Sequence, residues 1–250
     1  MARTVKEEEY AARRNEILAV VKRMVFTKGL DHMTIQDTLD ELRISKGAFY
    51  YYFDSKAAVQ GALIEQMVHE EVEPQLEAII QDPHLSALEK LHAYFHTSAR
   101  WKSERKEMIL SLMRVWYSDE NILFRHKLNE YALKRVTAMF AEIVRQGVRE
   151  GVFNTHYPEQ SGHMLIFIVQ GLGERFVRLL LNAEARDWSD PHVVDTVTES
   201  IAALSDMMER ILGAPKGSIH PIDPETIKIW FVPANDITEA ALLKNGKEYQ

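Results

Sequence analysis

The residues whose chemistry is most distinctive lie together in the stretch from residue 45 to residue 56, SKGAFYYYFDSK. A lysine ammonium such as that of Lys46 can donate hydrogen bonds to a guanine edge or to a phosphate. Tyrosine hydroxyls such as those of Tyr50 and Tyr51 can donate to phosphate oxygens, which fixes register without reading sequence. Gly47 has no side chain, so a helix that contains it can approach another molecule closely. This combination suits contact with the surface of a nucleic acid.

The first of two short predicted helices, which together would position these groups, covers residues 35–42. Its inward-facing residues recur at i, i+3, i+4 and i+7 and therefore share one face: Ile35, Thr38, Leu39 and Leu42. Thr34 precedes this run and is suited to be an N-cap, which accepts a hydrogen bond from a free amide of the first turn. Gln36, near the start of the helix, is a second candidate for contact with a base.

The second short helix begins after Ser45, its predicted N-cap, and would present Lys46, Gly47 and the tyrosines outward. Three residues at helical spacing would point back toward the core: Phe49, Tyr52 and Phe53. The helix that follows would offer its first amides and the Lys56 ammonium to a phosphate. Two helices joined in this way form a helix-turn-helix, whose second helix enters the major groove of DNA. A pair of core helices with incidental tyrosines is the alternative, but each buried hydroxyl would need a partner.

This stretch resembles the DNA-binding domain of the TetR family of bacterial transcriptional regulators. The matching positions are Thr34, Ile44, Ser45, Gly47, Phe49, Tyr50, Tyr52, Phe53 and Lys56. Leu39 departs from the usual small Ala, and Arg43 stands where the turn usually has Gly. Because Gly tolerates a positive φ, Arg43 is expected to cost about 1 kcal/mol of strain. The predicted DNA-binding residues are Thr34, Gln36, Ser45, Lys46, Gly47, Tyr50, Tyr51, Tyr52 and Lys56.

The formal net charge of −7 over 250 residues argues against nonspecific coating of nucleic acid. Residues 1–56 hold ten Lys or Arg against nine Asp or Glu, whereas the other 194 residues hold 20 against 28. An acidic body would disfavour DNA everywhere except at the motif. Cysteine is absent, and no run approaches the ~20 apolar residues of a membrane span. We therefore expect a cytoplasmic protein without disulfides and without a membrane partner.

Helical periodicity and helix breaks predict an all-α chain of about nine helices. A three-helix DNA-binding domain, with its helix-turn-helix at residues 34–53, would cover residues 10–71. A long helix from about Ser55, bent near Pro74, would connect it to a helical ligand-binding and dimerisation domain over residues 72–213. Residues 214–250 form an extension of unknown role, in which TIKIWFV has a strand-like run and DITEAALLKNG suits a short helix.

The segment 86–151 is rich in large, adaptable side chains, which could line a pocket for an apolar or aromatic small molecule. Ordinary core packing is the alternative for any one of them. The family resemblance favours a pocket in this part of the chain, for an effector whose identity the sequence does not give. The predicted lining residues, with one from a later helix, are Trp101, Met108, Met113, Trp116, Tyr117, Phe124, Tyr131 and Phe167.

Two predicted C-terminal helices have patterns that suggest an interface. The helix over residues 158–182 is apolar nearly all round at its centre, and such a helix is buried on every side. The helix over residues 191–212 carries apolar residues at the spacing of a coiled-coil seam. The corresponding pair in the TetR family forms a four-helix homodimer interface, and packing within one chain is the alternative. The predicted interface residues are Phe167, Gly171, Val194, Val197, Ile201, Leu204, Met208 and Ile211.

Sequence signatures of catalysis, metal binding and cofactor binding are missing. No G-x-S-x-G, H-E-x-x-H or phosphate-binding glycine loop occurs, and Gly171-Leu-Gly173 lies inside a predicted helix. His92 and His96 are spaced to share a helix face and could hold a metal, but no third ligand is near in sequence. We therefore predict no enzyme activity, no catalytic residue, no metal and no cofactor.

These patterns lead to one functional prediction and three alternatives. We predict a homodimeric repressor that binds a palindromic operator in double-stranded DNA and is released by a small-molecule effector. An activator of the same family is the closest alternative. A protein-interaction scaffold built on the C-terminal body is an alternative from another class, and it would not need Lys46 or Lys56. A helical enzyme would need paired acids or clustered metal ligands, and none is evident.

Overall fold

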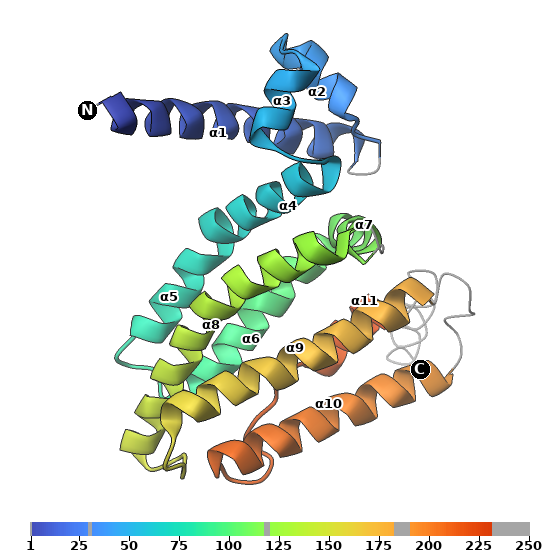
Figure 1. The fold of residues 1–250 in the computed structure, drawn as a ribbon. Coiled ribbons are helices and arrows are strands. Elements are labelled where there is room, and N and C mark those ends of the chain that lie inside the picture. Colours follow the sequence, from blue (N-terminus) through green and yellow to red (C-terminus); the bar gives the residue numbers. More distant parts are fainter. Residues whose placement is uncertain (1, 30–31, 118–120, 183–190, 232–250) are drawn as a thin grey trace, which may run out of the picture. The chain divides into compact units, whose positions relative to one another are not determined.

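The computed structural model describes residues 2–29, 32–117, 121–182 and 191–231. Within these residues the chain forms eleven α-helices and one π-helical segment, so the all-α prediction is confirmed (Figure 1). The helices group into two compact units. The first unit holds the described residues up to Glu73 together with those from Glu107 to Glu130, and the second unit holds the remainder.

The first unit contains the predicted helix-turn-helix. Its helices are α1 (Ala2–Lys28), α2 (Ile35–Leu42), α3 (Lys46–Tyr52) and α4 (Lys56–Met67). Five side chains from α1, α3 and α4 are completely buried and form the centre of its core: Ile17, Val21, Phe49, Val59 and Leu63. Burial of one such side chain stabilises a fold by about 1.5–3 kcal/mol. The first unit also includes most of α7 (Lys106–Trp116) and the first part of α8 (Ile122–Glu150), although the sequence pattern predicts both for the second domain.

The helix that begins with α4 changes its hydrogen-bond pattern where a bend was predicted. A π-helical segment, η1 (Val68–Val72), precedes α5 (Glu73–Gln81), and the Glu73 amide donates to the Val68 carbonyl five residues back. Pro74 lacks an amide hydrogen and its ring crowds the preceding turn, which disfavours the regular pattern there. The helix ends at Gln81, two residues before Pro83.

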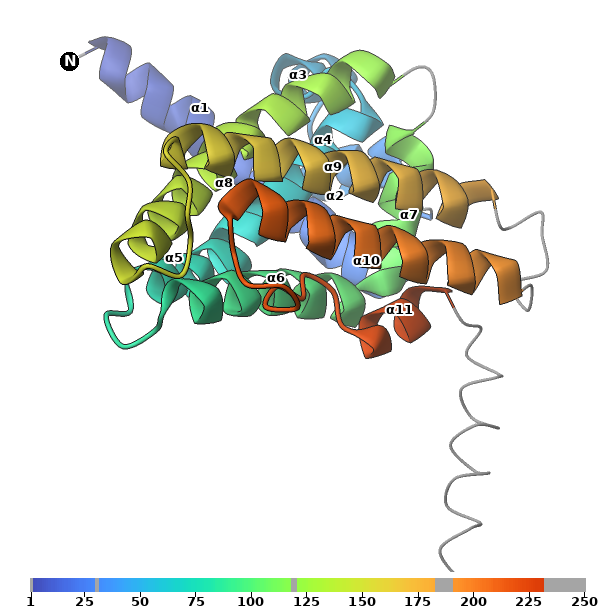
Figure 2. The same cartoon turned by 90° about the horizontal axis from the view of Figure 1, so that it is seen from below.

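The second unit is built around α6 (Ala87–Glu104), the rest of α8, α9 (Pro158–Asn182) and α10 (Pro191–Leu212). Helices α9 and α10 lie side by side (Figure 2). Helix α9 approaches α8 very closely at Gly162, where a Cβ atom would lie 2.9 Å from the backbone nitrogen of Ala141. Only glycine allows this approach, so Gly162 determines how closely α9 can pack against α8.

A buried lysine joins three segments of the second unit. The Lys90 side chain is almost fully buried, and its Nζ donates to the Ile80 carbonyl at 2.6 Å and to Gln146 Oε1 at 2.7 Å. The Gln146 amide in turn donates to the Leu85 carbonyl at 2.8 Å. Because buried polar groups are costly without partners, this network ties the end of α5 to α6 and α8.

The prediction of a strand-like run in the C-terminal extension is wrong, because TIKIWF forms part of helix α11 (Pro224–Phe231). Asp223 accepts a hydrogen bond from the Thr226 amide at 2.7 Å, and Pro224 occupies the first helical position that proline favours. Ile227 and Phe231 lie four residues apart on one face and are buried. The segment DITEAALLKNG lies outside the described residues.

We expect Lys90→Met to lower the free energy of unfolding by about 1–3 kcal/mol, because the Ile80 carbonyl and Gln146 lose a buried partner. Urea titration followed by circular dichroism would measure the change. Lys216→Met is the matched control: Lys216 is exposed, and its replacement should change stability by less than about 0.5 kcal/mol. Equal effects of the two substitutions would contradict the role assigned to the network.

Candidate DNA-binding surface

A reciprocal pair of hydrogen bonds starts helix α2. The Thr34 hydroxyl accepts from the Asp37 amide at 3.1 Å, and the Thr34 amide donates to Asp37 Oδ2 at 3.0 Å. The predicted N-cap is therefore confirmed. The hydrogen bond from the Thr34 amide, followed by that from its hydroxyl, lowers the pKa of the Asp37 carboxyl. The amide and the hydroxyl of Thr34 are thus both bonded to Asp37, and in this geometry Thr34 positions the start of helix α2.

The turn between α2 and α3 carries the strained residue that the sequence predicted. Arg43 has φ 51° and ψ 43°, the left-handed conformation that favours glycine. Among the described residues it is the one non-glycine residue with a positive φ. This conformation lets the amides of Arg43 and Ile44 donate to the Leu39 carbonyl, which closes the turn.

Helix α3 buries one face and exposes the other. Ser45 caps it by accepting from the Ala48 amide at 3.1 Å, and Phe49 is completely buried. Lys46 and Gly47 are exposed, and a Cβ on Gly47 would meet only the Ser45 side chain, at 3.9 Å. The predicted outer face of α3 is therefore present, with its cation and its bare backbone side by side.

The three tyrosines of α3 differ in exposure. Tyr51 is 70% exposed, Tyr50 is 38% exposed and Tyr52 is half-buried. Lys46 Nζ lies 5.9 Å from the centroid of the Tyr50 ring. Tyr52 contacts the rings of Tyr51 and Tyr10, so it supports its neighbour instead of facing outward alone.

The remaining predicted contact residues lie at the starts of helices α2 and α4. Gln36 is exposed, and its amide donates to Asp40 Oδ1 at 2.7 Å. Helix α4 begins at Lys56, after Ser55 accepts from the Ala58 amide at 3.0 Å as its N-cap. Lys56 is half-buried. A helix start of this kind favours phosphate through its amides and dipole.

Comparisons with known proteins agree with this geometry. The family model described as bacterial regulatory proteins, tetR family, matches residues 17–63, and one described as tetracyclin repressor-like, C-terminal domain, matches residues 113–172. The HTH-type transcriptional repressor KstR2 of Mycolicibacterium smegmatis is 30% identical over 153 residues, which cover 57% of this chain and 68% of that protein. The chain belongs to the TetR family of bacterial transcriptional regulators.

Other similar proteins share less sequence or less length. An uncharacterized HTH-type transcriptional regulator in the lacX 3′ region of Lactococcus lactis subsp. lactis is 40% identical over 55 residues, or 22% of this chain and 28% of that protein. A TetR/AcrR-family regulator from Thermobifida fusca is 25% identical, covers 63% of this chain and 81% of its own, and has a TM-score of 0.44. Reduced NemR from E. coli is 17% identical, and the match covers 81% of this chain and 98% of NemR with a TM-score of 0.46.

The residues predicted to line an effector pocket lie in different parts of this TetR-family chain. Trp101 is buried on α6 beneath the Arg105 guanidinium, 4.9 Å from its ring. Four half-buried residues follow on α7 or just after it, in the first unit: Met108, Met113, Trp116 and Tyr117. The side chains of Phe124 and Tyr131 lie outside the described residues. The pocket remains a prediction for these residues.

Phe167 does not fit an internal pocket. It is 55% exposed on α9 and lines a surface groove of about 630 Å³ with Tyr157, Met164 and Ile211. Phe167 is predicted to line the effector pocket, but this exposed position places it on the outer face of the second unit.

The predicted dimer seam on α10 requires a correction. Four of its residues are already buried within one chain: Val197, Ile201, Leu204 and Met208. Their side chains pack within their own subunit, so they are not part of the exposed surface of α10. Val194 and Ile211 are half-buried, and Gly171 is exposed with open space where a Cβ would lie.

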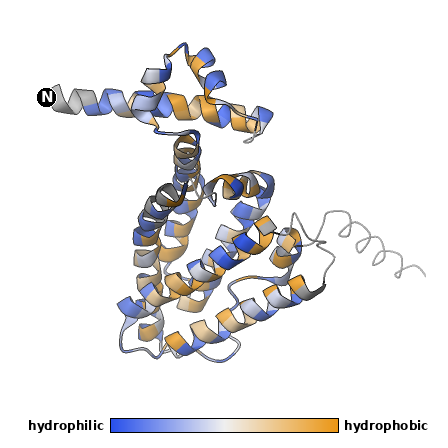
Figure 3. Cartoon of the chain, turned by 45° about the vertical axis from the view of Figure 1, so that its right-hand side comes forward, coloured by the Kyte–Doolittle hydropathy of each residue, from blue (hydrophilic) through white to orange (hydrophobic). Residues whose placement is uncertain are grey.

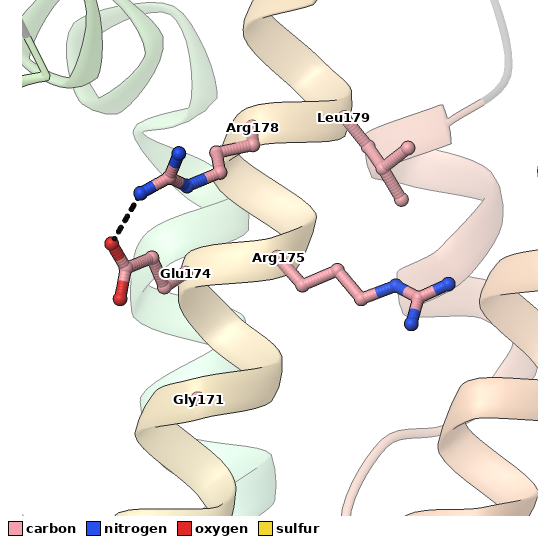
Figure 4. Close-up of a pocket in the computed structure, with 5 residues that line it drawn as sticks. All are labelled: Gly171, Glu174, Arg175, Arg178 and Leu179. Atoms are coloured by element: carbon pink, nitrogen blue, oxygen red, sulfur yellow. Dashed lines mark hydrogen bonds and ion pairs between the residues drawn. The ribbon is translucent and has the colours of Figure 1, made fainter.

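A charged patch continues along α9 beyond Gly171. Glu174 accepts from Arg178 at 3.0 Å, while Arg175 and Leu179 point to the other side of the helix (Figure 4). A surface hollow of about 360 Å³ lies over these residues. An exposed i, i+4 ion pair of this kind contributes little stability.

Two further observations concern metal binding and membranes. His92 Nε2 accepts from the His220 amide at 3.4 Å, so this histidine contacts the C-terminal segment. Across the part of the chain that the structure describes, no three His, Asp or Glu side chains are grouped as a metal site would require.

No helix in the same residues is both long and apolar enough to cross a bilayer.

Thr34→Ala should lower the free energy of unfolding by about 1 kcal/mol, and Thr34→Ser should retain most of it, because the cap needs only the hydroxyl. Urea titration at neutral pH would measure both. The Asp37 pKa is below its ordinary value of 3.8, so the carboxylate stabilises the fold above that pH. This contribution should disappear as the pH falls through the folded-state pKa. An Ala variant as stable as the Ser variant at neutral pH would contradict the capping role.

Proposed function

We propose that this TetR-family regulator is a dimeric repressor that binds a palindromic operator and is released by a small-molecule effector. The outer face of α3 is the observation that carries the proposal. Lys46 and Gly47 are exposed at its start, while buried Phe49 sets the rotation of the helix. The lysine would meet base edges, and the tyrosine hydroxyls would meet phosphates. The similarity to a protein described as a transcriptional repressor supports repression over activation.

The exposed apolar face of α9 and its neighbours supports the proposed homodimer. Met164, Phe167 and Tyr157 are 54%, 55% and 70% exposed, and Met207 on α10 is 42% exposed. Figure 3 shows hydrophobic residues interspersed with hydrophilic ones along both helices. Clustered exposed apolar side chains of this size mark interaction sites more often than free surface. A twofold axis would pair this face with the same face of a second copy.

Release by an effector would follow from unequal binding to two forms of the dimer. An effector that binds more tightly to the form unable to span both half-sites shifts the dimer toward that form and so lowers operator occupancy. The size of the shift is set by the difference between its affinities for the two forms. The large side chains on α7 and just after it, including Met108, Met113, Trp116 and Tyr117, remain our candidates for contact with it.

Selection of bound duplexes from a random DNA library tests the proposed function directly. Purified full-length protein would be used at near-physiological salt, because affinity for phosphate depends strongly on ionic strength. An enriched inverted repeat is the expected result, and its half-site spacing would report a twofold reader. Salt-sensitive binding without any enriched sequence would contradict the proposal.

Lys46→Ala and Lys56→Ala should have different effects on operator binding. Loss of Lys56 should weaken binding to all sequences alike and lower the salt slope by about one unit, because one phosphate contact disappears. Loss of Lys46 should also change the preferred base at one position of each half-site. Fluorescence anisotropy across a salt series and repeated duplex selection would measure the two effects. Lys216→Ala controls for lost charge, and unchanged base preference in the Lys46 variant would reduce that residue to a backbone contact.

Phe167→Arg should convert the dimer to monomers and abolish tight operator binding, because a buried unpaired charge at an apolar interface costs several kcal/mol. Sedimentation velocity would report the mass of the species. Val148→Arg, at a 37% exposed position of α8, is the matched control and should stay dimeric. A Phe167→Arg protein that remains dimeric would place the interface elsewhere.

A further inference from the structure

Three tyrosines from two helices form one cluster at the end of α3. Tyr10 on α1 lies 4.8 Å from the ring centroid of Tyr52 and 5.6 Å from that of Tyr51, and Tyr51 and Tyr52 are themselves 5.0 Å apart. The Tyr10–Tyr51 and Tyr51–Tyr52 pairs meet edge to face, which is a favourable arrangement for aromatic rings. Tyr10 is therefore part of the surface around α3, although it precedes Tyr51 by 41 residues.

A second contact between α1 and the end of α3 lies one turn further along α1. The Arg14 guanidinium lies over the ring of Phe53, 5.1 Å from its centroid. Tyr10 and Arg14 are four residues apart and therefore share one face of α1. Through these two residues α1 contacts three consecutive positions at the end of α3, namely Tyr51, Tyr52 and Phe53.

The exposure of the cluster separates it from ordinary core packing. Tyr10 is 38% exposed and Tyr51 is 70% exposed, whereas the next residues on this face of α1, Ile17 and Val21, are completely buried. Tyr51 keeps most of its surface exposed, so burial alone gives a weak reason for its place beside two other phenols. An exposed tyrosine without a neighbour would have to lose rotamer freedom when it binds a phosphate. The ring of Tyr10 restricts Tyr51 before any such contact is made.

We propose that Tyr10 is a positioning residue, which holds the Tyr51 side chain ready for a contact with the DNA backbone. The inference rests on the proposed function, because it needs α3 to bind DNA. Tyr10 acts through its ring, and Tyr51 supplies the hydroxyl that donates to the phosphate. Because phosphate contacts carry no sequence information, Tyr10 affects affinity and leaves base preference to the start of α3.

A double-mutant cycle on operator binding tests this assignment. Tyr10→Ala should weaken binding about three- to tenfold, and Tyr10→Phe should stay within about twofold of the original chain. Tyr51→Phe should weaken binding to a similar extent. The double variant Tyr10→Ala/Tyr51→Phe should be no weaker than Tyr51→Phe alone, because the ring would have nothing left to position. The base preference of all four variants should be unchanged in duplex selection.

A control and a DNA-free measurement keep loss of folding apart from loss of positioning. Phe26→Ala removes a 61% exposed aromatic ring from the same helix and should bind like the original chain. In protein labelled with 3-fluorotyrosine, the fluorine resonance that Tyr51→Phe removes should shift in Tyr10→Ala, since it loses a neighbouring ring. Tyr10→Phe should leave it nearly in place.

Four results would overturn the assignment. A Tyr51 resonance that does not respond to Tyr10→Ala would show that the rings do not restrict each other. Additive effects in the cycle would show that Tyr10 acts independently of Tyr51. A Tyr10→Phe variant as weak as Tyr10→Ala would give the contact to the Tyr10 hydroxyl itself. Failure of the unaltered chain to select any duplex would reject the proposed function and this inference with it, even if the resonance shifts.

Discussion

The burial of Phe49 is the contact on which the DNA-binding surface depends. Helix α3 has only seven residues, and a helix that short is unstable alone in water. Its rotation is therefore set by what it buries, namely Phe49 completely and Phe53 almost completely. Once these two rings face the core, Gly47 and Tyr51 must face outward, because each lies about 160° around the helix from Phe49. The hydrogen bond from the Ala48 amide to Ser45 fixes where this rotation begins.

Charge is distributed around the motif so that most cations already have partners. Lys28 donates to Asp37 at 3.3 Å, Lys22 to Glu70 at 3.4 Å, and Arg23 pairs with Glu41. Exposed ion pairs contribute little to stability, but they cancel the field of these lysines and arginines at a distance. Residues 1–56 hold ten Lys or Arg against nine Asp or Glu, so this segment as a whole is nearly neutral. Such an arrangement favours a specific contact over general attraction to nucleic acid.

The second unit uses one face of α10 for its own core and leaves apolar groups exposed on α9. Leu204 and Met208 are buried within the chain, while Met164 and Phe167 remain more than half exposed. The heptad-like spacing on α10 described a real apolar face, but the partner of that face is the same subunit. Helix α11 adds to this packing, since Phe231 meets Phe176 with ring centroids 5.6 Å apart and Trp230 donates to Ser103 at 2.9 Å. The described part of the extension, residues 214–231, thus packs within the second unit, where α11 contacts α6, α9 and α10.

The sequence by itself determined the features that depend on neighbours within about four residues. The caps at Thr34 and Ser45, the strained turn at Arg43 and an irregularity of the helix near Pro74 were all predictable, because each needs only local hydrogen bonds or a local steric limit. The tertiary structure decided which side of α10 is buried, that TIKIWF is helical, and that Tyr10 meets Tyr51. These outcomes depend on contacts such as that between Trp230 and Ser103, which are 127 residues apart. A periodic pattern defines an apolar face, but only the folded chain supplies the surface that covers it.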